Sequence, residues 1–155
     1  RQAELAIRGN ANRAKLRPQL EQIRDVMDEV FACDTAFGDC DRGSMSSGHC
    51  FFSSMVVQDL FGGVIRFDRV KKIPHYWTQV GKTSVDLTGD QLGRARVQVT
   101  QRNLYGGGQP FQRRRGTLLT GEDNREAMRK YKRFRGRLAT ALRDQGLGSY
   151  ATRLT

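Results

Sequence analysis

The chain has 155 residues, of which 37% are hydrophobic and 28% charged, and its formal net charge is +11 at pH 7. This length suits one domain with a hydrophobic core, and no apolar run approaches the roughly 18 residues of a membrane span. The missing apolar run argues against a membrane-spanning protein, and the excess of Lys and Arg favours acidic partners, either nucleic acid or an acidic protein.

Three cysteines, Cys33, Cys40 and Cys50, are an odd number, so they cannot form a complete disulfide framework. A reducing, cytoplasmic location is therefore the default expectation. A Cys33–Cys40 bridge that leaves Cys50 free is an alternative that the sequence leaves open. No signal peptide opens the chain, but the chain begins with Arg1, so its first residues say nothing about a leader.

The chain opens with a basic lead-in, residues 1–17, which is either helical or loosely attached. From Pro18, a favourable residue in the first turn of a helix, the helical signal strengthens. Apolar residues recur there at three- and four-residue steps up to Phe31 and give one apolar face. The pattern predicts a helix whose signal is strongest from Pro18 onward.

A loop and a second helix are expected next. Residues 33–48 are dominated by Gly, Asp and Ser, which is typical of a loop. The helix is expected from about His49 to Phe61, with Ser46 or Ser47 as its cap. Its residues are apolar nearly all round, which indicates a central helix buried on all sides.

Strand patterns follow the second helix. The segment "VIRF" (64–67), continuing into "DRVKK", alternates between apolar and polar residues. The segments "HYWTQV" (75–80) and "TSVDL" (83–87) flank Gly81 and predict a pair of antiparallel strands joined by a turn. A further strand, at the edge of the sheet, is expected within residues 95–101.

The C-terminal part combines a basic loop with a long basic helix. Residues 102–116 are rich in Gly and Arg and predict a loop, and Glu122–Arg143 has an apolar stripe that predicts a helix. Residues 146–155 are expected to be a frayed tail. The resulting division is a lead-in, one domain over residues 18–145, and the tail.

Cys50 is placed where a loop turns into a helix. A thiol in the first turn of a helix experiences the positive end of the helix dipole and unpaired backbone amides, which favour the thiolate, the nucleophilic form. Gly48 would let a substrate approach closely, and the amide of Cys50 could face a developing oxyanion. The competing interpretation is that Cys50 is a buried core residue, as free cysteines commonly are.

Two more residues make a catalytic interpretation stronger than the core interpretation. His75 opens one predicted strand and Asp86 lies on the next, so pairing across Gly81 would place the two side chains on one face. Asp86 could then orient the imidazole while its other nitrogen faces Cys50. A structural role for Asp86, capping the turn that begins at Thr88, is the alternative.

These residues also resemble a known family. "HYWTQVGKTSVDLT" is similar to the pattern around the His and Asp of transglutaminases, and the order Cys, His, Asp resembles the papain-like superfamily. "GHCFFSSMVVQDLFGG" together with that segment more closely resembles the small bacterial YunG-like family. "CDTAF" and "RKYKRFRGRL" resemble the loop before the cysteine and the closing helix of that family, so the likeness covers roughly residues 20–143.

The resemblance implies an α+β, papain-like or transglutaminase-like fold, with a central helix on a small antiparallel sheet and a long C-terminal helix. It implies a catalytic triad of Cys50, His75 and Asp86 acting on an unknown acyl or peptide-like substrate, without a cofactor. Relatives often carry Gln in place of His49, so any oxyanion role of that residue would fall to His49, beside Gly48. Trp77 could line a substrate groove, although packing in the core is the simpler role.

The sequence also contains residues that suit two other kinds of site. Zinc-type ligands are present, but the spacing of the cysteines lacks the C-x2-C knuckle of zinc sites, so no metal is expected. The alternative function is a catalytically inactive module that binds nucleic acid or an acidic protein through Arg113, Arg114 and Arg115. Tyr105 and Phe111 in the same loop would supply stacking surfaces.

Overall fold

The computed structural model describes residues 13–37, 40, 43–112 and 124–155. The helices of this part are α2 (Arg13–Asp28), α3 (Cys50–Phe61), α4 (Asn124–Asp144) and α5 (Gly148–Leu154). The strands are β1 (Val64–Val70), β2 (Ile73–Val80), β3 (Thr83–Asp86), β4 (Gln98–Thr100) and β5 (Gln109–Phe111). The expected α+β class is confirmed.

All strand pairs of the sheet are antiparallel, in the order β4-β3-β2-β1-β5. The predicted pairing across Gly81 is confirmed, because Val80 lies opposite Thr83 and Thr78 opposite Val85. β4 lies at one edge, as expected from the sequence. The other edge, β5, falls inside the segment that composition predicted to be a loop.

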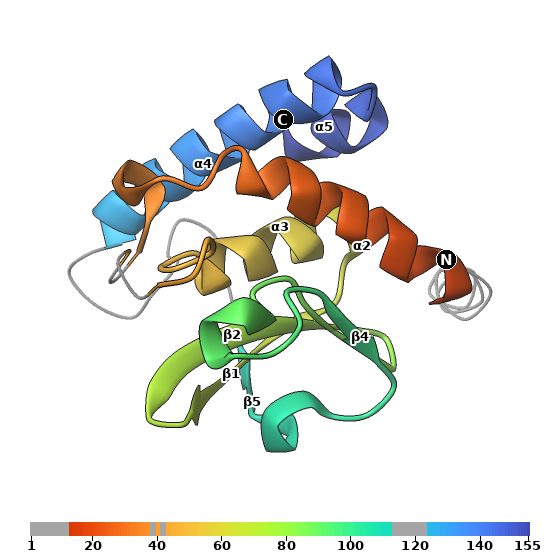
Figure 1. Ribbon diagram of the computed structural model, residues 1–155, viewed down its shortest axis with the longest axis vertical. Coiled ribbons are helices and arrows are strands. Elements are labelled where there is room, and N and C mark those ends of the chain that lie inside the picture. Colours follow the sequence, from red (N-terminus) through yellow and green to blue (C-terminus); the bar gives the residue numbers. More distant parts are fainter. Residues whose placement is uncertain (1–12, 38–39, 41–42, 113–123) are drawn as a thin grey trace.

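The elements are arranged in layers, with α3 between the sheet and the layer formed by α2 and α4 (Figure 1). Eight of the twelve residues of α3 are buried, which agrees with its apolar sequence on all sides. A hydrogen bond from the Thr78 hydroxyl to the Ser54 carbonyl (2.8 Å) fixes α3 across β2. The Phe51 ring stacks on the Tyr76 ring with centroids 4.5 Å apart, so the beginning of α3, where Cys50 stands, lies over the first half of β2.

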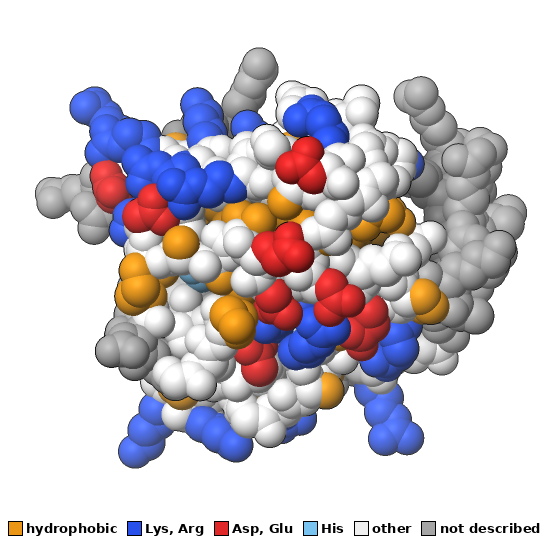
Figure 2. Space-filling model, turned by 45° about the horizontal axis from the view of Figure 1, so that its top comes forward, with side chains coloured by type: hydrophobic (Ala, Val, Ile, Leu, Met, Phe, Trp, Pro, Cys, Tyr) orange, Lys and Arg blue, Asp and Glu red, His pale blue; other side chains and the backbone are white. Residues whose placement is uncertain are grey.

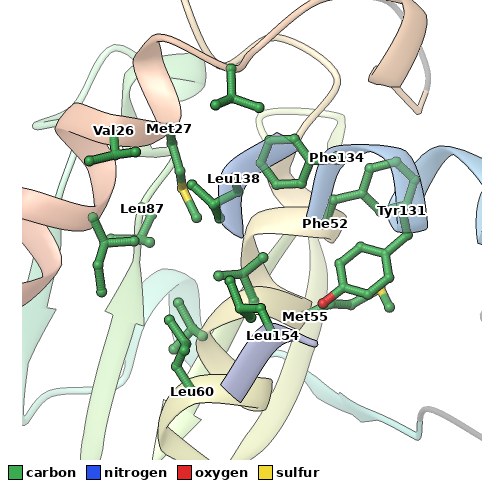
Figure 3. Close-up of a cluster of buried hydrophobic side chains, with 14 of the residues drawn as sticks. Val26, Met27, Phe52, Met55, Leu60, Leu87, Tyr131, Phe134, Leu138 and Leu154 are labelled. Atoms are coloured by element: carbon green, nitrogen blue, oxygen red, sulfur yellow. The ribbon is translucent and has the colours of Figure 1, made fainter. Parts of the chain in front are cut away.

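The hydrophobic core fills the space between α3 and the outer helices. Side chains from α2, α3, α4 and α5 converge there with Leu87, which follows β3 (Figure 3). Phe134 of α4 stacks on Phe31 with ring centroids 5.8 Å apart and an interplanar angle of 3°. The long C-terminal helix is thus part of the core, as predicted, and not an appended basic arm.

The last residues of the lead-in are helical, one of the two alternatives that the sequence left open, because α2 begins at Arg13, before Pro18. Proline inside a helix removes one backbone hydrogen bond. Tertiary contacts offset this loss: Leu16 packs against the core, and the Arg17 guanidinium donates to the Val99 carbonyl (2.9 Å).

The predicted serine caps of α3 were wrong. His49 is the residue that precedes α3, and its side chain makes no capping hydrogen bond. The Ser46 hydroxyl instead donates to the Asp90 carboxylate (2.8 Å), and the Ser47 hydroxyl lies 3.1 Å from that of Ser44. Both serines therefore order the loop before Cys50 and not the helix end.

The expected frayed tail is instead a packed helix. Gly146 adopts a φ of +78°, which turns the chain back after α4 and lets α5 form. Ala151 and Leu154 of α5 are buried in the core cluster. A helix of seven residues with few apolar side chains has little local signal, so its stability comes from this packing.

Figure 2 shows acidic and basic side chains next to one another on the face that it presents. Arg96, for example, contacts the carboxylates of Glu21, Asp25 and Asp28. Within the described residues, no helix is both long enough and apolar enough to cross a membrane.

Gly136 offers a site where a substitution should stabilise the fold. It lies on the exposed side of α4, and a Cβ built there meets no atom within 4 Å. Gly136→Ala is expected to raise the free energy of unfolding by about 0.5–1 kcal/mol, because alanine loses less backbone entropy in a helix. Urea denaturation measures this change. Gly146→Ala is the contrasting variant: its Cβ also meets open space, but its φ of +78° should make the substitution destabilising.

Candidate functional site

Cys50 is the first residue of α3 and is partly exposed. Helix geometry leaves the amides of a first turn, including the backbone N–H of Cys50, without intrahelical acceptors. The Ser54 hydroxyl donates to the Cys50 carbonyl (2.7 Å), one turn along the helix. Gly48 adopts a φ of +78°, and its carbonyl accepts the amide of Phe37 (2.8 Å), which fixes the chain just before the thiol.

His75 and Asp86 lie together, as predicted from the strand pairing. His75 Nε2 is 2.8 Å from Asp86 Oδ2, and both side chains are almost completely buried. The other carboxylate oxygen, Oδ1, accepts the amide of Thr88 (2.8 Å) and its hydroxyl (3.1 Å). Asp86 therefore holds the turn and the imidazole at once, so the two roles considered for it are compatible.

The second ring nitrogen of His75, Nδ1, is buried without a hydrogen-bond partner of normal geometry in the described part of the chain. Burial lowers the pKa of His75, but hydrogen bonding and charge from Asp86, together with the nearby Cys50 thiol, outweigh it and raise the pKa to about 10. Since Nε2 is committed to Asp86, Nδ1 is the nitrogen available to Cys50. The structure thus brings the three predicted residues together.

Tyr105 is a neighbour of this cluster that sequence reasoning missed. Its hydroxyl donates to Asp86 Oδ2 (2.5 Å) and accepts from the side-chain amide of Gln98 (2.5 Å). The sequence had suggested only a stacking surface in a basic loop. One feature of the sequence could have indicated this contact: the three glycines after Tyr105 permit an unusual backbone conformation and a close approach of this turn to the sheet.

The His49 ring does not reach the candidate site. It is buried between Phe31 and Phe134, with ring centroids 4.8 and 5.2 Å away. Its Nδ1–H donates to the Ser47 carbonyl (3.0 Å), and Nε2 is 2.8 Å from the Thr35 hydroxyl. Burial lowers the pKa of His49 despite the hydrogen bond to Ser47, which favours a neutral ring. This side chain is thus not positioned for an oxyanion.

Trp77 packs as a core residue and does not line a groove, since its side chain is 1% exposed. Its ring meets Tyr105 edge-on, with centroids 5.1 Å apart, and lies 6.4 Å from the His75 ring. A Cβ on Gly108 would come within 2.6 Å of the Trp77 ring. The simpler of the two sequence interpretations therefore holds for Trp77, which supports the His75 ring from behind.

The cysteines divide into a bonded pair and a free thiol. Cys33 and Cys40 form a disulfide with an S–S distance of 2.18 Å, the alternative that the sequence left open, and Cys50 is free. Among the described residues, no three His, Cys, Asp or Glu side chains are grouped so that they could hold a metal ion. The cytoplasmic location inferred from the cysteine count stays a prediction.

The predicted binding residues Arg113, Arg114 and Arg115 lie outside the described residues, so their role in binding an acidic partner or nucleic acid stays a prediction. Further along, α4 exposes several cations, some of which are paired: Arg133 and Arg137 contact the carboxylate of Asp34.

The fold and the site define an α+β domain in which a cysteine at a helix start lies beside a buried His–Asp pair. The family model described as YunG protein matches residues 19–143, so the chain belongs to the YunG family. Searches of curated proteins and of solved structures found no match to this chain.

Proposed function

We propose that this protein is a papain-like or transglutaminase-like thiol enzyme that cleaves or transfers acyl groups from amides or thioesters. The observation that carries the proposal is the buried His75–Asp86 pair, 2.8 Å apart, beside the free thiol of Cys50. A buried carboxylate is costly unless it is paired. The carboxylate of Asp86 is paired with one nitrogen of the His75 ring, so the other ring nitrogen is available to the Cys50 thiol.

Each proposed step follows from these positions. His75 Nδ1 accepts the proton of the Cys50 thiol, and the sulfur attacks the carbonyl carbon of the substrate. The amide of Cys50 stabilises the oxyanion, and His75 returns its proton to the departing amine or thiol. Water or an amine then attacks the acyl-enzyme with His75 as base, which releases an acid or a new amide. Asp86 keeps the ring oriented throughout.

Alkylation by iodoacetamide tests the proposal without knowledge of the substrate. At pH 6 an ordinary thiol is almost entirely protonated and therefore reacts slowly with iodoacetamide. Because the proposal has His75 take the proton of the Cys50 thiol, Cys50 is expected to react at least about tenfold faster than free cysteine. His75→Ala should bring the rate down to that of an ordinary thiol. Mass spectrometry of the peptide that contains Cys50 measures the rate, and Gln79→Ala, a change on the same strand outside the cluster, is the control.

The proposal fails if Cys50 in the unaltered protein reacts no faster than free cysteine, or if His75→Ala and Gln79→Ala react alike. A second measurement addresses the acyl step itself. Incubation with a peptide thioester should add the acyl mass to the intact protein, and Cys50→Ser should abolish the addition of this thioester-linked, hydroxylamine-sensitive group.

A further inference from the structure

Tyr105 completes the set of donors around the Asp86 carboxylate. Oδ1 accepts two hydrogen bonds from Thr88, while Oδ2 accepts one from His75 and one from Tyr105. The direction of the last bond is defined, because the Gln98 amide donates to the phenol oxygen and leaves its single proton for Asp86. His75 and Tyr105 therefore share one carboxylate oxygen.

The ring of Tyr105 is also placed against the histidine. It meets the His75 ring at 89° with centroids 5.3 Å apart, and it meets the Trp77 ring at 75° with centroids 5.1 Å apart. These edge contacts are favourable arrangements for aromatic rings. Burial and the charge of Asp86 raise the pKa of Tyr105, so the phenol keeps its proton over the whole working range of the site.

The backbone at Tyr105 adopts a conformation that few residues of its kind adopt. Its φ of 51° and ψ of 37° lie in the left-handed region, which is uncommon for a bulky side chain. The Arg66 guanidinium donates to the carbonyls of Gly107 (2.8 Å) and Gly108 (2.9 Å) and holds this turn on β1. Costly backbone conformations of this kind cluster at functional sites, where the surroundings maintain them.

We propose that Tyr105 is a positioning residue that acts through Asp86: by sharing Oδ2 with His75, it limits how strongly the carboxylate holds the imidazolium proton. Its part in a reaction rests on the proposed function, in which His75 must give that proton to the leaving group. Thr88 alone already fixes the carboxylate through Oδ1. Tyr105 therefore acts mainly by reducing the negative charge that Asp86 Oδ2 presents to His75 Nε2.

The test is the titration of His75 by NMR in the full chain. Cys50→Ala serves as the background, because it removes the thiol from the titration, and the chain has only two histidines to assign. Tyr105→Phe in this background keeps the ring contacts and removes one donor from Oδ2. The titration midpoint of His75 is expected to shift upward by roughly half to one pH unit, since a hydrogen bond to a charged group has about that influence.

Tyr150→Phe is the matched control, since it removes a phenol from α5 that packs on Phe61 and should leave the midpoint unchanged. The His49 signal reports in each variant whether the surrounding fold is intact. An unchanged or lowered His75 midpoint in Tyr105→Phe overturns the role of Tyr105. That failure is distinct from failure of the proposed function, which is read from alkylation of Cys50 in protein that retains the thiol.

Discussion

Replacing Arg24 by methionine is expected to lower the free energy of unfolding by about 3 kcal/mol, the lower end of the range for buried ion pairs, because Arg24 is buried while the carboxylates of Asp90 and Asp28 are 22% and 28% exposed. Arg24 is 1% exposed, and its guanidinium donates to both oxygens of Asp90 (2.7 and 3.2 Å) and to the Leu87 carbonyl (2.6 Å). It also contacts Asp28 at 2.7 Å and lies 5.2 Å from the centre of the Phe31 ring. Methionine would keep the apolar stem and leave these acceptors without their donor.

The loss should depend on pH in a defined direction. Burial alone would raise the pKa of Asp90, but Arg24 and the Ser46 hydroxyl outweigh it and hold the pKa below its usual range. In the unaltered protein Asp90 thus contributes stability above the unfolded pKa of about 3.9, and this is lost as the pH falls through the folded value. Without Arg24 the main group that opposes burial is gone, so the pKa of Asp90 should rise and the deficit of the variant should shrink as the pH falls below about 4.

Urea unfolding at pH 7 and pH 3.5 measures both effects. Arg96→Met is the matched control: Arg96 contacts three carboxylates as well, but its side chain is 36% exposed, so a loss of at most about 1 kcal/mol is expected. Adding Asp90→Asn to Arg24→Met should recover part of the stability, because it removes the unpaired charge. Equal losses for Arg24→Met and Arg96→Met would show that burial adds nothing to this ion pair.

Part of the fold and of the candidate site could be predicted from the sequence alone. The pairing of β2 with β3 was predictable because the turn at Gly81 is local and the alternation of side chains sets the register. That register places His75 and Asp86 on one face, so two members of the candidate site followed from neighbouring segments. The position of Cys50 followed from the apolar helix and the loop before it.

Features that depend on distant parts of the chain were not predictable. Arg24 looks like an ordinary surface residue of a polar helix, because Asp90, which pairs with it, lies 66 residues away. β5 has only three residues, including Pro110, and becomes a strand because β1 presents a free edge to it. Tyr105 reaches Asp86 only through a turn that Arg66 of β1 holds. In each case the decisive contact is tertiary.

Asp86→Asn is expected to lower the free energy of unfolding at pH 7 by about 1–3 kcal/mol, because an amide cannot accept all the hydrogen bonds that the carboxylate accepts. Oδ1 and Oδ2 accept two donors each, and the side chain is 1% exposed. The amide nitrogen would face two donors, whichever way the side chain is turned. At least one buried donor would therefore stay unpaired.

The pH dependence of stability separates this loss from a general loosening of the fold. The folded pKa of His75, about 10, lies above its unfolded value of about 6.5, so the charged ring stabilises the protein fully below pH 6.5. That stability is lost as the pH rises toward 10. Asp86→Asn removes the main cause of the raised pKa, so the difference between the two unfolding free energies should shrink between pH 6.5 and pH 10, down to the cost of the unpaired donor.

Urea unfolding at pH 6, 7.5, 9 and 10 measures how this difference shrinks. Asp144→Asn, at the exposed end of α4, is the matched control and should follow the unaltered protein at every pH. A difference between Asp86→Asn and the unaltered protein that stays constant up to pH 10 would mean that Asp86 does not hold a proton on His75. The same result would remove the imidazolium on which thiolate formation at Cys50 depends, so this measurement of stability also bears on the proposed chemistry.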